Sequence, residues 1–236
     1  MLPRRRHEIS RLEAFSDAAF AFALTLLIVS LDVPRSYDQL TQLMKGFFSF
    51  ACCFALLVWI WHEHNMFFRR SGLQDGVTVV LNGLLLFLVL FYVYPLKFMF
   101  DSMFAMFIRG AYPDLVGMNF QQLSRASAIY GGGFVAMFLA FAALYWHAYR
   151  KRGELQLTPQ EEFDIKAFAG HHLVSVGVGL FAILVAIAAP LRYAFLSPMC
   201  FALMGPAHWY FGTMMEKRRA LLVRRDEEPA HAPAEA

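Results

Sequence analysis

Charge is scarce in this chain of 236 residues, and long parts of it carry none. Lys, Arg, Asp and Glu make up 17% of the sequence, whereas hydrophobic residues make up 58%. Four segments contain no Lys, Arg, Asp or Glu, namely 76–96, 126–149, 167–191 and 193–215. A membrane span needs about 20 consecutive apolar residues. This pattern excludes a soluble domain and predicts four helices that cross a membrane.

Cysteine is also rare, and the patterns of several other protein classes are missing. The three cysteines lie in apolar segments, so we expect no disulfide framework. No basic patch with interleaved aromatic residues stands outside the loops, which argues against nucleic-acid binding. His62 and His64 point about 200° apart on a helix, so they are poor ligands for one metal ion. We therefore expect a membrane protein without a metal site.

Two further segments are shorter and need their flanking residues in order to cross. Residues 46–61 can extend outward through residues 40–44. Residues 18–31 would rise only about 21 Å as a helix, short of a hydrocarbon core about 30 Å thick. This first helix must therefore also include Phe15, Ser16 and Asp17. The predicted fold is all-α: a polytopic membrane protein with six transmembrane helices in a domain over 1–215, followed by a basic cytoplasmic helix and a disordered tail over 216–236.

The basic residues give the orientation of these helices. Most of the 21 Lys and Arg residues fall on one side of a six-helix arrangement, the side that also carries both ends of the chain. The positive-inside rule places that side in the cytoplasm. We therefore expect cytoplasmic N- and C-termini in a multi-pass protein of the cell inner (plasma) membrane. The net charge of +3 reflects this asymmetry and does not indicate a nucleic-acid partner.

The first helix has two different faces. At about 100° per residue, Phe22, Thr25, Leu26 and Val29 form one stripe, and Asp17 points away from it. A charge at the centre of a bilayer costs roughly 2.5–3.5 kcal/mol, so Asp17 needs either headgroup depth or a partner. Ordinary helix packing would also explain the stripe.

Polar residues of two other helices are expected at the depth of Asp17. Asn82 lies near the start of the third helix, and the second helix ends in Trp59, Trp61, His62, Glu63 and His64. Together with Ser16 and Asp17 they could form a satisfied polar network. The alternative is that the histidines beside the tryptophans form only an interfacial pair.

Some of these residues resemble a known family. The RxxxFSD signature of the transmembrane protein 175 family of potassium channels is matched by Arg11, Phe15, Ser16 and Asp17. The segment that begins at Ala21 resembles the AxAxTLLxxxLxxP segment that follows this signature. Weaker matches are Trp59 with His62, which resemble a WxxH pair of the second helix, and Asn82 with Pro95, which resemble the third-helix pattern.

The resemblance implies a homotetramer in the lipid bilayer, with the first helix of each subunit lining a central pore. It implies a hydrophobic constriction at Phe22, where the family usually has an aliphatic residue, with Thr25, Leu26 and Val29 along the same stripe. Such a gate works by excluding water and needs no carbonyl filter. The resemblance also implies a group of residues behind the first helix that support it, the FSD motif with its neighbours, namely Arg11, Phe15, Ser16, Asp17, Trp59, His62 and Asn82.

The function implied by the resemblance is a potassium-preferring monovalent cation channel. A channel performs no chemistry, so we expect neither enzyme activity nor a cofactor, only permeant potassium and other monovalent cations. Asp32 could form a ring of acids at the outer mouth, or it could simply end the first helix. Residues 175–179, SVGVG, look like a potassium filter loop, but they lie inside an uncharged helix, where glycine more often allows close helix contact.

Other functions stay open at this point. Phe22 and the many histidines would also fit a weakly selective cation channel or a proton leak channel. A secondary carrier would be expected to show internal repeats, which are missing here. A membrane redox protein could hold haem between histidines such as His171 and His172, although no pair has a distinctive spacing.

Overall fold

The computed structural model describes residues 9–105, 119–193 and 195–227 of the chain. Every regular element in these residues is a helix, so the predicted all-α fold is confirmed. The long helices are α1 (Arg11–Val29), α3 (Phe47–Ser71), α4 (Gly76–Ala105), α5 (Phe120–Arg150), α6 (Pro159–Ala188) and α8 (Met204–Glu227). The short elements are α2 (Tyr37–Lys45), α7 (Leu196–Met199) and the 3-10 segments η2 (Leu191–Tyr193) and η3 (Cys200–Leu203).

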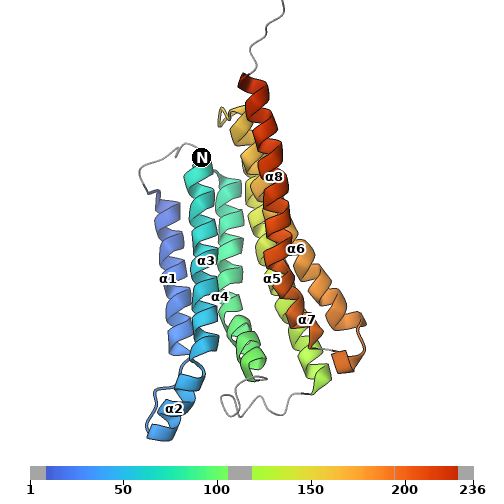
Figure 1. The fold of residues 1–236 in the computed structure, drawn as a ribbon. Helices are drawn as coiled ribbons and strands as arrows, with labels where there is room; N and C mark the ends of the chain where they lie inside the picture. Colours follow the sequence, from blue (N-terminus) through green and yellow to red (C-terminus); the bar gives the residue numbers. More distant parts are fainter. Residues whose placement is uncertain (1–8, 106–118, 194, 228–236) are drawn as a thin grey trace, which may run out of the picture.

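The long helices form two groups that meet along α4 and α5. Helices α1, α3 and α4 lie side by side in one group, and α5, α6 and α8 form the other (Figure 1). Aromatic side chains fill the space between the groups. The rings of Phe67 in α3 and Tyr145 in α5, for example, are both fully buried and pack edge to face with centroids 5.1 Å apart. This core holds α1 and its neighbours against the second group.

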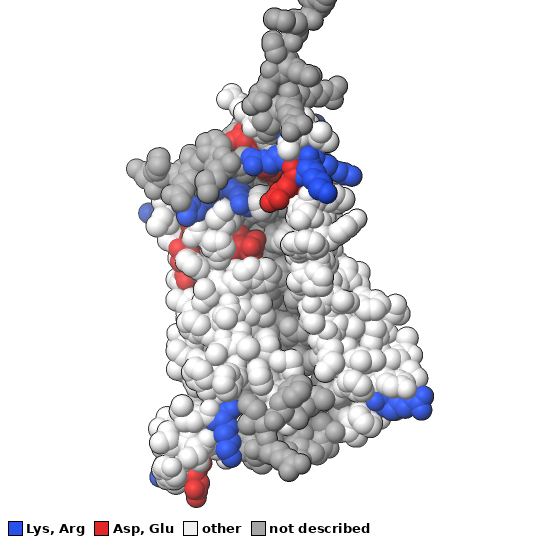
Figure 2. All heavy atoms as spheres, viewed as in Figure 1, with Lys and Arg blue, Asp and Glu red and all other residues white. Residues whose placement is uncertain are grey.

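Among the described residues, five helices are long and apolar enough to cross a membrane, namely α1, α3, α4, α5 and α6. On the face shown in Figure 2, charged side chains gather toward the two ends of the molecule, with an uncharged band between them. A band of this kind matches the hydrocarbon core of a bilayer. The chain is therefore a multi-pass membrane protein, as the sequence predicts.

The first helix starts well before its uncharged segment. Ser10 and Glu13 form a capping box at its start, in which each backbone N–H donates to the other side chain, at 2.8 Å and 3.2 Å. From Arg11 the helix runs for 19 residues, a rise of about 28 Å. The prediction that Phe15, Ser16 and Asp17 belong to this helix is confirmed.

The predicted sixth span, 193–215, is divided among η2, α7, η3 and α8. Pro198 in α7 and Pro206 near the start of α8 lack a backbone N–H, which explains the irregular helical geometry here. Helix α8 then continues to Glu227 and crosses the expected domain boundary after residue 215. The sixth span and the boundary stay predictions, and of the predicted disordered tail, residues 228–236 lie outside the described part of the chain.

The segment 175–179 lies in the middle of α6, which is continuous, so it is not a filter loop. Its glycines include one at a tight contact with α5. A Cβ added at Gly179 would lie 2.7 Å from Cγ2 of Val135 and 3.0 Å from Cδ1 of Phe134. Small residues let helix backbones approach closely in membranes, where packing drives helix association. Gly179 therefore allows the close contact between α5 and α6.

We expect Gly179→Ala to lower the stability of the protein by about 1–3 kcal/mol, since an extra methyl group in a packed interface forces its neighbours to shift. Gly177→Ala is the matched control, because a Cβ at Gly177 meets nothing within 4 Å. The control gains helix propensity of up to about 1 kcal/mol. Thermal unfolding midpoints of the two variants in the same detergent check this prediction. Equal midpoints would contradict it.

A second contact between the two helix groups lies at the loop between α3 and α4. Oδ1 of Asp75 accepts hydrogen bonds from the backbone N and Oγ1 of Thr78, at 2.9 Å and 2.6 Å, and so caps α4. Oδ2 of Asp75 lies 2.8 Å from Nε2 of His147 and 3.2 Å from Nζ of Lys151, both at the end of α5. Partial burial raises the pKa of Asp75, but these hydrogen bonds outweigh it and hold the pKa well below its usual value.

The lowered pKa of Asp75 predicts a dependence of stability on pH. The carboxylate contributes its stability above the unfolded-state pKa of 3.8, and this contribution is lost as the pH falls toward the lower pKa of the folded state. We expect Asp75→Asn to lower the unfolding midpoint at neutral pH and to flatten its decline below about pH 4. Glu154→Gln is the control, because this carboxylate bonds Lys151 but is largely exposed. Asp75→Asn and Glu154→Gln profiles that coincide would argue against this role of Asp75.

Candidate functional site

One face of α1 is bonded to α4 and α3 through a chain of buried side chains. Ser16, which is 0% exposed, donates from Oγ to the carbonyl oxygen of Leu12 at 2.8 Å and accepts from Nδ2 of Asn82 at 2.9 Å. Oδ1 of Asn82 lies 2.7 Å from Nε2 of His64. Because the amide oxygen can only accept, the imidazole nitrogen donates in this bond. The Ser16–Asn82–His64 chain therefore joins three helices.

Asp17 also has a partner in α3. Its Oδ1 accepts a hydrogen bond from the indole Nε1 of Trp61 at 2.7 Å. A hydrogen bond to an ionised carboxylate is stronger than one between neutral groups. Asp17 is thus held by a specific donor and points to α3. We call Ser16, Asp17, Trp61, His64 and Asn82 the supporting network.

The structure places two expected residues of the second membrane helix elsewhere. Trp59 packs on the ring of Phe138, with centroids 5.7 Å apart, and His62 is exposed. The contacts that were expected of Trp59 and His62 are made instead by Trp61 and His64. The sequence WIWHEH contains the WxxH spacing twice, and the second copy starts at Trp61.

The opposite face of α1 is open in the single chain. Phe22 is 55% and Val29 69% exposed, and Thr25 is exposed as well, with its hydroxyl donating to the carbonyl oxygen of Ala21 at 2.9 Å. Leu26 is half-buried and packs against the core. An exposed apolar stripe beside a tightly bonded face is typical of a helix that lines an interface or a lumen.

Three further predicted residues lie away from the supporting network. Arg11 and Phe15 are exposed, and their spacing of seven residues from Ala18 and Phe22 puts them on the open face of α1. Asp32 is exposed in the connection between α1 and α2. It lies beyond Val29, the last residue of α1, and so is not part of the first helix. These residues do not contribute to the bonds that hold α1 against α3 and α4.

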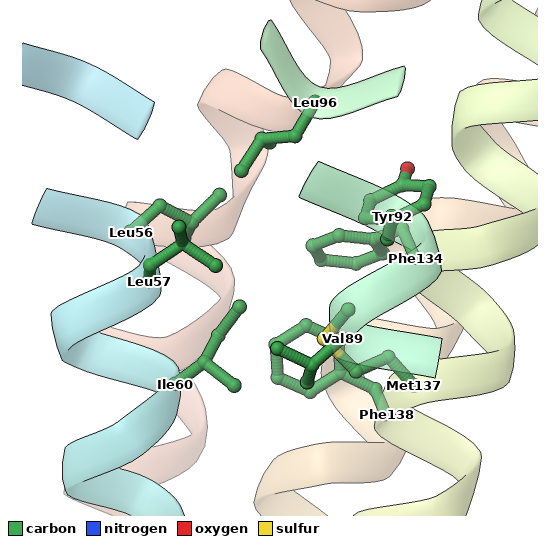
Figure 3. A pocket seen from close by; sticks show the side chains of 9 residues that line it. All are labelled: Leu56, Leu57, Ile60, Val89, Tyr92, Leu96, Phe134, Met137 and Phe138. Atoms are coloured by element: carbon green, nitrogen blue, oxygen red, sulfur yellow. The ribbon is translucent and has the colours of Figure 1, made fainter. Parts of the chain in front are cut away.

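The cavity between α3, α4 and α5 is apolar. Its side chains point toward one another, from α3 on one side and from α4 and α5 on the other (Figure 3). Tyr92 supplies the hydroxyl group at its edge, but this group donates to the carbonyl oxygen of Tyr130. The cavity has no ligands that could replace the hydration shell of an ion. The lining residues are Leu56, Leu57, Ile60, Val89, Tyr92, Leu96, Phe134, Met137 and Phe138.

The histidines of α6 and α8 are packed too closely for haem between them. Nδ1 of His171 lies 3.1 Å from Nδ1 of His208, and Nε2 of His208 lies 3.0 Å from Oγ of Ser175. Metal–imidazole bonds are about 2 Å long, so ligands on opposite sides of one metal would be about 4 Å apart. His172 instead stacks on Phe141, with ring centroids 4.9 Å apart. Across the described ranges, no group of three or more His, Cys, Asp or Glu side chains could hold a metal ion.

Comparison with known proteins agrees with the RxxxFSD resemblance. A sequence profile of the family described as endosomal/lysosomal potassium channel TMEM175 matches residues 11–92, which contain the whole supporting network. A potassium channel of Marivirga tractuosa is 36% identical over 234 residues, which cover 93% of each chain. A potassium channel of Streptomyces collinus is 31% identical over 150 residues, which cover 61% of this chain and 66% of the relative.

Solved structures of two such channels have a similar fold. A variant of the potassium channel MtTMEM175, crystallised with a nanobody–MBP fusion protein, superposes with a TM-score of 0.81 at 34% identity, over 92% of this chain and 97% of that one. A lysosomal potassium-selective channel TMEM175 homolog from Chamaesiphon minutus gives a TM-score of 0.58 at 25% identity, over 87% and 96% of the two chains. These proteins are ion channels and not enzymes. The chain therefore belongs to the TMEM175 family of potassium channels.

Proposed function

We propose that the chain assembles as a homotetramer in a cell inner (plasma) membrane and forms a potassium-preferring channel for monovalent cations. In this arrangement α1 of each subunit lines a central pore, and the permeant potassium ion is the ligand, without a cofactor. The single observation that carries the proposal is the two-faced α1. One face is bonded to α3 and α4 through Ser16 and Asp17, while Phe22, Thr25 and Val29 are uncovered.

The proposed gate is a ring of Phe22 side chains, with Thr25 and Val29 along the same face. An apolar ring of small radius excludes water and raises the barrier for an ion until the helices move apart. Leu26 is half-buried, so it supports the wall of the pore more than its surface. The apolar cavity between α3, α4 and α5 supports a pathway outside the single subunit, since it offers no polar ligand to an ion.

The proposed topology has six spans and cytoplasmic termini, with η2, α7, η3 and the first part of α8 completing the sixth span. The distribution of basic residues supports this orientation. Asp32 would then lie near the outer mouth, where an exposed acid can raise the local concentration of cations.

A flux assay tests the proposed function. Purified protein in liposomes is given gradients of potassium, sodium and protons in parallel, and its mass is measured in nanodiscs. We expect tetramers that pass potassium faster than sodium or protons. Folded tetramers that pass no monovalent cation would refute the proposal. Saturable counterflow would identify a carrier, and equal rates for the three cations would identify a weakly selective or proton leak channel.

A further inference from the structure

Helix α2 is a nine-residue helix that the protein itself leaves uncovered. None of its residues, all of which the structure describes, is buried. Its start is capped locally, since the N–H of Gln39 donates to Oγ of Ser36 at 3.2 Å and Oε1 of Gln39 accepts from the N–H of Arg35 at 2.7 Å. A helix shorter than about 12 residues is only marginally stable in water. Because most helical stability in proteins comes from packing of an apolar face, an apolar surface outside the single chain would stabilise α2 further.

The residues of α2 divide into two faces. At about 100° per residue, the polar face carries Asp38, Gln39, Gln42 and Lys45. The opposite face is apolar and well exposed, with Tyr37 78%, Leu40 43% and Met44 59% accessible. Leu43 lies on this face as well. The apolar face continues into α3 at Phe47, which is 54% exposed. Such a clean division is typical of a helix that lies in the plane of a membrane surface.

The apolar face of α2 lies next to the start of a candidate membrane span. Only Gly46 separates the end of α2 from the start of α3, which is long and apolar enough to cross the membrane. Helix α2 also projects beyond the ends of α1 and α3, away from the rest of the molecule (Figure 1). Its apolar face is therefore at one end of the molecule and is continuous with the apolar start of a candidate membrane span.

The charges on α2 indicate that it would bind the apolar part of the lipid and not charged headgroups. Asp38 in the first turn and Lys45 in the last turn balance each other. Each also lies near the helix end whose dipole it complements. A net charge of zero leaves burial of Tyr37, Leu40, Leu43 and Met44 as the source of binding.

We propose that α2 is an interfacial helix whose apolar face binds the lipid surface at the end of the molecule where α1 ends and α3 begins. Residues 30–36 connect it directly to the end of α1. A lipid-bound α2 thus restrains the position of this end of α1. This last consequence rests on the proposed function, because it matters for conduction only if α1 lines the pore.

The binding of α2 to lipid is tested by site-directed spin labelling of the full chain in phosphatidylcholine liposomes. The three native cysteines are replaced by alanine, and a single cysteine is introduced by Leu40→Cys on the apolar face or by Gln42→Cys on the polar face. Both positions are exposed, so the label disturbs no internal packing. Collisions of the label with oxygen, which concentrates in lipid, are compared with collisions with a water-soluble nickel complex.

We expect the label at position 40 to collide several-fold more with oxygen than with the nickel complex, and the label at position 42 to show the reverse. Equal access of the nickel complex to both positions would place α2 in water and overturn the proposal. Protection of position 40 from both reagents would show that a second subunit covers it, which would also overturn the proposal. Because the readout is independent of ion flux, these outcomes are separate from failure of the channel function.

Discussion

Replacing Asn82 with alanine is expected to destabilise the protein by about 2–4 kcal/mol and to remove most of the assembled channel. Asn82 is 1% exposed and bonds Ser16 of α1 and His64 of α3 at once. Interhelical side-chain hydrogen bonds in membranes are each worth roughly 0.6–1.7 kcal/mol. The substitution also leaves the buried imidazole of His64 without its partner, which adds about 1–3 kcal/mol.

The effect of Asn82→Ala is measured as the thermal unfolding midpoint and as the fraction of tetramer in nanodiscs. Leu84→Ala, a truncation on the exposed side of α4, is the matched control and should change little. The unfolding midpoint and tetramer fraction of Ser16→Ala should lie between those of Asn82→Ala and Leu84→Ala. Ser16→Ala removes only one bond to Asn82 and leaves Asn82 in place as the partner of the imidazole. Channels that survive should keep their selectivity. A normal yield of Asn82→Ala tetramers with altered selectivity would show that the network faces the ion instead.

Replacing Phe22 with alanine is expected to leave folding intact and to raise conductance. The phenyl ring is 55% exposed in the single chain, so its loss opens no cavity in the core. In the proposed tetramer it removes the bulky ring of the gate, which lowers the dewetting barrier. A barrier lowered by about 1.4 kcal/mol raises the rate of passage about tenfold.

Single-channel currents of Phe22→Ala in potassium and sodium check this effect. Phe22→Leu is the control, because it restores the aliphatic character that is usual in the family. Its conductance should lie between that of the unmodified channel and that of Phe22→Ala. Ile28→Ala is a second control on an exposed residue of α1 outside the stripe, and it should leave the current nearly unchanged. An unchanged current in Phe22→Ala, with normal expression and assembly, would remove Phe22 from the gate.

The features of α1 could be predicted from sequence because several constraints agree there. An uncharged run too short to cross a bilayer requires the helix to include Phe15, Ser16 and Asp17, and an acid at that depth needs a partner. The structure places the start a few residues earlier, at Arg11, where Ser10 and Glu13 form a capping box. The separation of Asp17 from Phe22 follows from helix geometry alone.

The partners of Asp17 and Ser16 could not be assigned as easily, because the WxxH spacing occurs in two registers in α3. Both fit the local pattern, and they differ by about 200° of rotation on the helix. The deciding signal is the periodicity of buried residues over the whole helix. Cys53, Leu57, Ile60, His64 and Phe67 follow one another at intervals of three or four residues, and this stripe includes His64 but not His62.

The breaks within two hydrophobic segments were the hardest features to predict. The segment 193–215 is uncharged, and its hydrophobicity alone predicts one continuous helix. Its two prolines interrupt the helix, and the segment is divided among several shorter elements. Helix α2 was expected only as an extension of the second span. Gly46, a poor helix former, allows the chain to change direction there, and the amphipathic pattern before it marks a separate helix.

Cadmium block of a single introduced cysteine tests the central claim, that the open face of α1 lines the pore. Thr25→Cys is placed in the cysteine-free chain, and Leu84→Cys on the exposed side of α4 is the control. A ring of thiolates from neighbouring subunits binds a soft metal ion tightly. We expect micromolar cadmium to block potassium flux through the Thr25→Cys channel and not through the control. Block of the control with unimpaired flux through Thr25→Cys would contradict it.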